Sequence, residues 1–163
     1  MKDPNKKPQD YVPPDSAEEL LRRHAQGERY FVRAKLKEAR LTQANLHKAN
    51  LQNAILKEAD LKEAYLYKAN LRSADLYEAD LQGVNLGKAT MEKTILECAN
   101  LEGAFLRNTE LKGAYLENAN LKEADLNGAT LDGAELKGAT YSKATIFPDE
   151  FDPNAHGMVQ ETK

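Results

Sequence analysis

The chain has 163 residues, 30% of them charged, and its formal net charge is −3 at pH 7. This balance favours neither a nucleic-acid-binding protein nor an acidic tail, and the lack of an apolar run of about 18 residues predicts no membrane-spanning segment. The N-terminus lacks the apolar stretch of a signal peptide, and the single cysteine, Cys98, cannot form an internal disulfide. We therefore expect one domain in the reducing cytoplasm.

The first 28 residues contain a tail and a short helix. Residues 1–14 hold four of the six prolines and several charges, and we expect them to be a disordered tail. Within residues 15–28, Ser16 and Glu19 form a capping-box pattern, and Gly27 is placed to end the helix. The face that the helix would bury consists of Ala17, Leu20, Leu21 and His24.

Residues 29–146 follow a period of five. Leucine recurs at every fifth position from Leu36, and alanine stands two positions before it in most units up to Ala144. In an α-helix these leucines would scatter around the cylinder, and in one continuous strand they would alternate between faces. Within a single unit, however, alanine and leucine point to the same side of a short extended segment, and the next two residues can turn the chain. The pattern therefore predicts a coil with alanine and leucine inside, in unbroken register from Phe31 to Ile146.

Two departures from the pattern lead to local expectations. Val84, Met91 and Thr94 replace the usual inner residues, so we expect an irregular core there. The second corner residue is mostly charged in the first half, as at Glu38 and Lys48, and mostly glycine later. Because a type II turn needs positive φ at this position, we expect few type II corners early in the chain and more of them late.

The triplets Ala49-Asn50-Leu51 and Ala79-Asp80-Leu81 are of the A-(N/D)-L-x-x type. With this pattern kept across residues 29–146, the chain resembles the pentapeptide-repeat family, and the lead-in before the repeats is similar to that of cyanobacterial members. The resemblance implies an all-β solenoid, a right-handed quadrilateral β-helix with four units per coil. The helix within residues 15–28 would cap its N-terminal end, and residues 147–163 would form a C-terminal cap and tail.

Several apolar side chains occupy outward positions and form a candidate interface. With coils of 20 residues, Ile55, Ile95 and Tyr115 share one face, and Tyr65 and Phe105 share the opposite face. Contiguous exposed apolar surface marks partner sites, although such rings can also stack on their neighbours in the next coil. The complete set is Ile55, Tyr65, Tyr67, Tyr77, Ile95, Phe105 and Tyr115.

The sequence contains no arrangement of residues that is typical of an enzyme active site. His24, His47 and His156 are far apart in the chain, and a single cysteine does not support a zinc site. Carboxylates are plentiful, but on a convex rod nothing would desolvate them and tune their pKa values. We expect no enzymatic activity, no cofactor and no metal.

The functional hypothesis is a non-catalytic scaffold that binds a protein partner, since fold alone does not fix function. One alternative is a DNA-mimicking modulator of gyrase, a type II topoisomerase, which the family resemblance suggests. Another is a weak nucleic-acid binder that uses a lysine column beside the aromatic residues, although acidic residues crowd the neighbouring columns. That column consists of Lys48, Lys68 and Lys88. The oligomeric state is left open, with a slight preference for a monomer.

Overall fold

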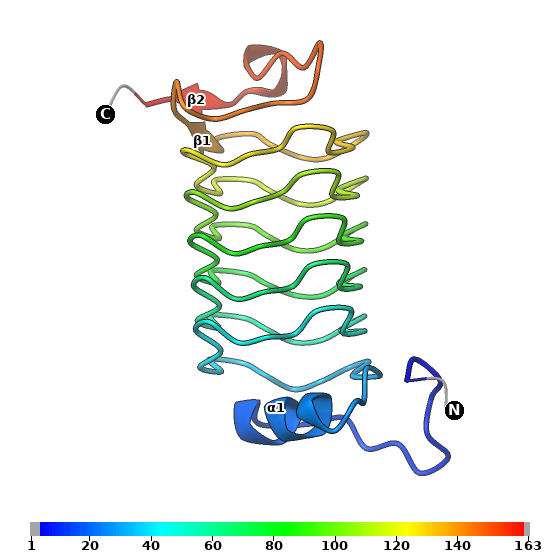
Figure 1. Ribbon diagram of the computed structural model, residues 1–163. Helices are drawn as coiled ribbons and strands as arrows, with labels where there is room; N and C mark the ends of the chain where they lie inside the picture. The colour runs from blue at the N-terminus through cyan, green and yellow to red at the C-terminus, as the bar shows by residue number, and fades with distance from the viewer. Residues whose placement is uncertain (1–3, 162–163) are drawn as a thin grey trace.

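The structure, a computed structural model, describes residues 4–161, so the ends of the expected tail (1–3) and of the expected C-terminal segment (162–163) lie outside the described part. Figure 1 shows a rod of stacked coils with helix α1 across one end and a folded segment across the other. The elements are α1 (Ala17–Ala25), β1 (Thr140–Tyr141), the 3-10 helix η1 (Asn154–His156) and β2 (Val159–Gln160).

The coils are held in register by parallel β-bridges between residues 20 positions apart. The middle residue of each unit forms the bridge, as in Asn50–Asn70, Ile55–Asp75 and Asp60–Asp80. Because one unit has five residues, each coil contains four units, and each side of the rod carries one column of bridged residues. The outward positions that the sequence analysis assigned to common faces therefore do stack in columns.

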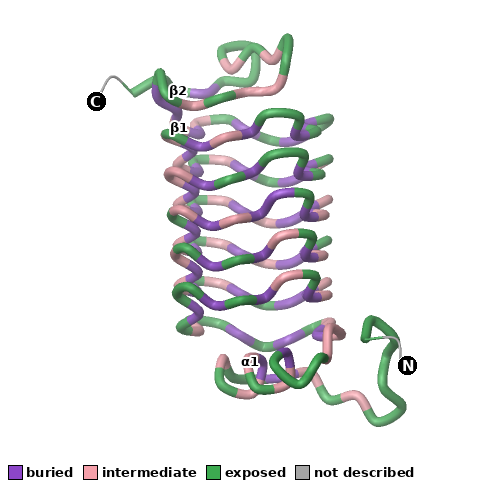
Figure 2. Tube along the Cα trace, viewed as in Figure 1, coloured by how far each residue is buried: buried purple, intermediate pink, exposed green. Residues whose placement is uncertain are grey.

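Alanine and leucine fill the interior of the rod. Leu56, Leu76 and Ala59 expose 1% or less of their surface, and Figure 2 shows buried positions recurring along every coil while the corners are mostly exposed or half-buried. Full burial of a leucine side chain contributes roughly 1.5–3 kcal/mol. The repeated pairs of inward residues thus provide most of the hydrophobic stabilisation.

The corners have nearly the same backbone conformation along the whole rod. From Arg33 to Gly138, the second corner residue has a positive φ wherever the five-residue register holds, between 54° and 74°. With the bond from the Ala59 amide to the Leu56 carbonyl (3.1 Å) and its equivalents, this is the geometry of a type II turn. The expectation of few such corners in the first half was wrong. At the corners from Arg33 to Asn118 the second amide also bonds to the next coil, as Glu58 N–H does to Tyr77 O (2.9 Å), and this ladder overrides the local preference for glycine.

The inner replacements leave the backbone regular. Val84, Met91 and Thr94 are fully buried, and the bridges continue past them without interruption. The Thr94 hydroxyl donates to the Leu71 carbonyl at 2.8 Å, and Thr109 bonds to Leu86 in the same way at 2.9 Å. Because each buried hydroxyl finds a partner, threonine substitutes for alanine without the local irregularity that we expected.

The register shifts by one residue in the last unit. Asp125 is bridged to Ile146, 21 positions away, and it is Thr145 that takes the inner position, with its hydroxyl bonded to Leu121 O at 2.9 Å. Ala144 is exposed, and Ile146 exposes 45% of its surface. The expected unbroken register to Ile146 was therefore wrong, because the Ser142–Thr145 turn contains one residue more and has no positive φ.

Helix α1 begins and ends with standard caps. The Ser16 hydroxyl accepts a bond from Glu19 N–H (3.3 Å), and at the other end Gly27, with φ 92°, lies where the chain leaves the helix. The bonds from Gly27 N–H to His24 O and from Glu28 N–H to Arg23 O form a Schellman motif. Leu20 is fully buried in the core, and α1 covers the end of the rod.

The described part of the expected tail, residues 4–14, lies against the N-terminal end of the rod. Pro14 O accepts a bond from Lys35 N–H (2.8 Å), and the Tyr11 hydroxyl donates to Val32 O (2.8 Å). Tyr11 also packs edge-on against Tyr30 at 4.8 Å. The division of the chain into a tail, a helix, a repeat region and a C-terminal segment stays a prediction.

The C-terminal segment covers part of the last coil. β2 pairs in parallel with β1, with Thr140 opposite Val159. The Phe147 ring lies between the rings of Tyr141 (5.4 Å) and Phe151 (5.1 Å), and Met158 of the same segment is buried in the core. The paired strand and the rings protect one edge of the last coil.

Candidate interaction surface

The candidate interface residues fall into two columns on opposite sides of the rod. One column contains Ile55, Asp75, Ile95 and Tyr115 in successive coils, and the other contains Tyr65, Asn85 and Phe105. Ile55 exposes 43% and Tyr115 37% of its surface, against 41% for Tyr65 and 55% for Phe105. Tyr67, Tyr77 and Ile95 are half-buried. The seven residues are therefore not one patch.

The Ile55 column is interrupted by charge. Asp75 lies between Ile55 and Ile95 and pairs with Lys57 at 3.2 Å, while the Lys57 ammonium lies 5.8 Å from the centre of the Tyr77 ring. Above Tyr115, the hydrogen bond that protonated Glu135 donates to the neighbouring Glu117 raises the pKa of Glu135. Apolar contact area on this side is divided into small parts.

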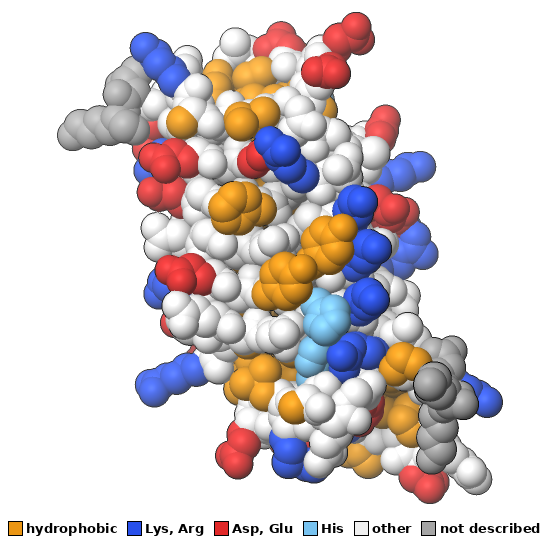
Figure 3. All heavy atoms as spheres, in the orientation of Figure 1, with side chains coloured by type: hydrophobic (Ala, Val, Ile, Leu, Met, Phe, Trp, Pro, Cys, Tyr) orange, Lys and Arg blue, Asp and Glu red, His pale blue; other side chains and the backbone are white. Residues whose placement is uncertain are grey.

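The opposite side carries a group of neighbouring rings and, two coils further along the rod than Tyr65, the Phe105 ring. Tyr65 stacks on Tyr67 with 6.1 Å between centroids and 8° between planes, and His47 lies 6.3 Å from Tyr65. We call Tyr65, Tyr67 and Phe105 the aromatic face. In Figure 3, hydrophobic side chains, histidines and a row of Lys and Arg side chains lie next to one another on this side of the molecule.

Gly87 determines where the Tyr67 ring lies. It is the only glycine at a first corner position, whereas the other corner glycines hold the second position with positive φ. A Cβ atom at Gly87 would meet the Tyr67 ring at 3.2 Å, and the Gly87 amide donates to Asn85 Oδ1 (3.1 Å). The sequence analysis missed this contact, although the unusual position of the glycine was a signal for it.

The corner next to the aromatic face carries only basic charges. Lys48, Lys68, Lys88 and Arg107 occupy it in successive coils, and no acidic residue stands at any corner position of this edge from His47 to Gly128. We call these four residues the basic edge. Within residues 4–161, its three lysines have no ion pair, and the Lys68 ammonium lies 5.5 Å from the centre of the Tyr67 ring. Arg107 pairs with Asp125.

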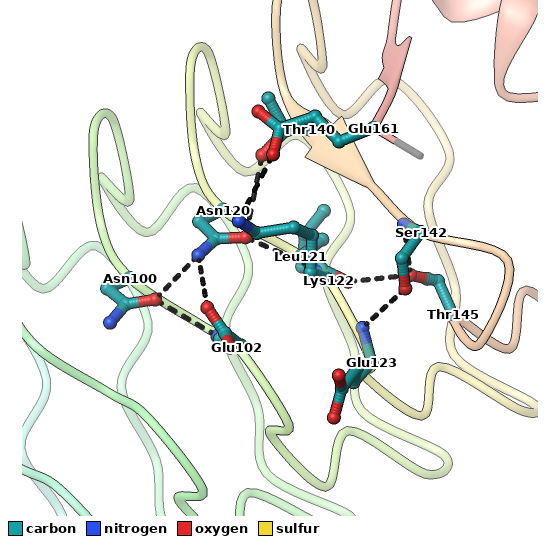
Figure 4. Close-up of polar contacts among 10 residues, drawn as sticks. All are labelled: Asn100, Glu102, Asn120, Leu121, Lys122, Glu123, Thr140, Ser142, Thr145 and Glu161. Carbon is teal, nitrogen blue, oxygen red and sulfur yellow. Dashed lines mark hydrogen bonds and ion pairs between the residues drawn. The ribbon is translucent and has the colours of Figure 1, made fainter. Parts of the chain in front are cut away.

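Several charged and polar side chains elsewhere on the rod are paired with one another. Lys37 pairs with Glu38 and Glu58, and Lys62 pairs with Asp80 at 3.0 Å. Figure 4 shows the asparagine column near the C-terminal end, where Asn120 donates to Asn100 and Glu102, both at 3.0 Å, and Lys122 pairs with Glu161. These side chains therefore satisfy one another's hydrogen-bonding and charge requirements.

Two of the three histidines meet, contrary to the expectation from their spacing. α1 brings His24 to within 5.7 Å of His47, and His24 Nε2 lies 3.1 Å from the His47 carbonyl oxygen. Burial lowers the pKa of His24. His156 stacks on Phe151 at the other end of the rod.

The described residues offer little to a small ligand. Within residues 4–161, no group of three or more His, Cys, Asp or Glu side chains could hold a metal ion. Two hollows lie at the ends of the rod, one of about 360 Å³ beside Phe151 and one of about 310 Å³ beside Tyr11. The α-helix of this part is too short and too polar to cross a membrane.

Comparison with known proteins places the repeats in a family. The family described as pentapeptide repeats matches in overlapping stretches that cover residues 34–140. No curated protein matches the sequence. The solved structure of pentapeptide-repeat protein Rfr23 from the cyanobacterium Cyanothece 51142 is 33% identical, with a TM-score of 0.61 over 80% of this chain and 99% of that chain.

Two other solved structures are similar in sequence but superpose less closely. The protein alr5209 from Nostoc PCC 7120 is 31% identical, with a TM-score of 0.37 over 93% of this chain and 100% of its own. HetL from Nostoc sp. strain PCC 7120, a protein involved in heterocyst differentiation regulation, is 26% identical, with a TM-score of 0.44 over 90% and 94%. The matched repeats and the bridged columns lead to one conclusion: the chain belongs to the pentapeptide-repeat family.

Proposed function

We propose that this protein is a non-catalytic scaffold that binds a protein partner through the aromatic face. The main observation in support of this proposal is the exposure of Tyr65 and Phe105 in one column, beside the stacked Tyr67. Exposed aromatic residues in a cluster are typical of binding surfaces, because their large rings lose little conformational freedom on contact. The right-handed four-sided rod that the family resemblance implies would hold the rings in fixed positions.

The test is comparative affinity capture from the source cell's lysate. In the first variant, Tyr65→Asn and Phe105→Asn remove the aromatic face, and asparagine suits these positions because Asn45 and Asn85 hold the same column. The matched control carries Ile55→Asn and Tyr115→Asn on the opposite side. We expect a protein that is captured by the parent and by the control and lost with the first variant. Equal capture by all three baits would contradict the proposal.

Two other hypotheses from the sequence stay predictions. A DNA-mimicking modulator of gyrase would inhibit DNA supercoiling in a direct assay with the purified enzyme. A weak nucleic-acid binder would be retained on immobilised DNA, and its retention would fall steeply with salt because counterions are released on binding. Both assays use the intact chain.

A further inference from the structure

We propose that the partner presents a short acidic segment that lies along the basic edge and places one aromatic or aliphatic side chain on the aromatic face, between Tyr65 and Phe105. This inference rests on the proposed function and names the chemistry of the partner. It follows from the charges on the basic edge, from its length and from the ring spacing beside it.

The three lysines of the basic edge have no ion pair in the described structure, residues 4–161. Lys48, Lys68 and Lys88 are exposed and stand in successive coils, which are about 4.8 Å apart. Some lysines elsewhere, such as Lys57 and Lys62, are paired with carboxylates at 3.2 and 3.0 Å, and the unpaired lysines at other corners share their edges with acidic residues. An anionic partner would reduce the repulsion between like charges that stand in one column without counter-charges. Charge complementarity of this kind sets the specificity and the association rate of binding.

The length of the basic edge fits a short peptide segment. From Lys48 to Arg107 it spans three coil spacings, or about 14 Å. An extended segment of four or five residues covers this distance, since each residue advances about 3.3 Å. Such a segment can carry two or three carboxylates facing the lysines.

The ring spacing leaves room for one side chain of the segment. Tyr65 and Phe105 are two coils apart, or about 10 Å, and the smaller Asn85 lies between them. Asn85 is half-buried, with its Oδ1 already accepting the Gly87 amide. An apolar side chain above Asn85 could therefore contact both rings without displacing a paired polar group.

The surroundings favour a protein segment over a nucleic-acid strand. The basic edge offers four cations, and Arg107 is already paired with Asp125. Glu110 lies exposed at the adjacent column in the same coil. A longer polyanion would have to continue past Asp125 in the next coil, whereas a segment of four or five residues ends at Arg107.

The experiment selects random 12-residue peptides, displayed on phage, against the intact chain. We expect enriched peptides to combine Asp or Glu with at least one aromatic or aliphatic residue. Their affinity for K48Q/K68Q/K88Q should be at least tenfold weaker than for the parent, as measured by fluorescence anisotropy. Glutamine suits these corners, because Gln43 already adopts φ 57° at the equivalent position of another corner.

The matched control is K93Q/K112Q/K137Q, which makes the same charge change at exposed, unpaired lysines on other edges of the rod. We expect its affinity for the peptides to stay within twofold of the parent. Enriched peptides without an acidic excess, equal loss with both triple variants, or no enrichment would each overturn the inference. So would a 12-nucleotide oligothymidylate that binds more tightly than the peptides and is lost with K48Q/K68Q/K88Q, because the edge would then serve nucleic acid.

The Y65N/F105N variant separates this inference from the proposed function. Peptides that need Tyr65 and Phe105 but bind K48Q/K68Q/K88Q like the parent leave the scaffold standing and refute the acidic segment. Peptides that need neither set of residues refute both. Circular dichroism spectra that match the parent show that each variant is folded in the assay.

Discussion

At the scale of single residues, the buried leucines set the stability of the rod. Leu76 lies at mid-rod and is fully buried, so Leu76→Ala leaves a cavity that neighbouring coils cannot close. We expect the free energy of unfolding to fall by about 2–5 kcal/mol, as measured by chemical denaturation. Ile55→Ala, at a position 43% exposed, should lower it by less than about 1 kcal/mol. Equal losses for the two variants would contradict the stacked core.

His24 makes the N-terminal end of the rod sensitive to pH. Burial lowers its pKa in the folded chain, and the nearby charges of Arg29 and His47 act in the same direction, against the hydrogen bond with the His47 carbonyl. The unfolded chain, with a histidine pKa near 6.5, therefore binds a proton first as the pH falls. The stability present above about pH 6.5 is lost as the pH falls toward the folded pKa.

The measurement compares melting temperatures of the parent and His24→Gln at pH 7.5 and pH 5. Because the carboxylates are the same in both proteins, the difference between them reports His24. We expect the parent to lose more stability than the variant on acidification. An equal loss would show that protonation of His24 has no net effect on folding.

At the scale of elements, each regular corner requires a left-handed backbone conformation that is unfavourable for most residues other than glycine. Gly103 has φ 65°, and an added Cβ would meet no atom within 4 Å, so Gly103→Ala tests the backbone alone. We expect it to lower the free energy of unfolding by about 1–2 kcal/mol, because a left-handed conformation is unfavourable for alanine. Gly103→Asn should lose less, since asparagine tolerates this region, as at Asn108 and Asn118. Thermal melts that rank alanine equal to asparagine would contradict this account.

The same corners show what the sequence could and could not predict. The spacing of alanine and leucine was sufficient to predict the columns of stacked residues, because it fixes which side chains face inward. Residue preference failed at Glu38 and Lys48, where hydrogen bonds to the next coil impose positive φ on side chains that rarely adopt it. Periodicity also failed at Ala144 and Ile146, since an extra residue in one turn leaves the apparent five-residue spacing intact.

The candidate site was predictable only in part. The 20-residue coil was sufficient to assign Tyr65 and Phe105 to one side and Ile55 to the other. The stacking of Tyr67 above Gly87 depends on the shape of one corner, and the meeting of His24 with His47 depends on how α1 lies across the rod. Both are long-range contacts that the spacing of residues in the sequence does not predict.

At the scale of the whole molecule, the rod is a one-dimensional stack in which each coil contacts only its neighbours. Stability in such arrays is close to a sum over units and their interfaces. The basic edge and the aromatic face lie in the coils up to Arg107, and the C-terminal segment contacts the last coil through bonds such as Gly138 N–H to Gly157 O and Val159 N–H to Ala139 O. A coil between these two parts should therefore be removable.

Deletion of residues 109–128 removes one full coil and joins Asn108 to Ala129, which takes the inner position of Thr109. We expect a cooperative thermal melt at a lower temperature than the parent, with the aromatic face and basic edge retained. Deletion of residues 109–130 removes two residues more and leaves one side too short to span the coil, so this variant should not melt cooperatively. An extra residue can be accommodated in a turn, as at Ser142–Thr145, but a missing one cannot be replaced. Circular dichroism would follow the thermal melts of both deletion variants. Equally cooperative melts would contradict the fixed repeat of 20 residues.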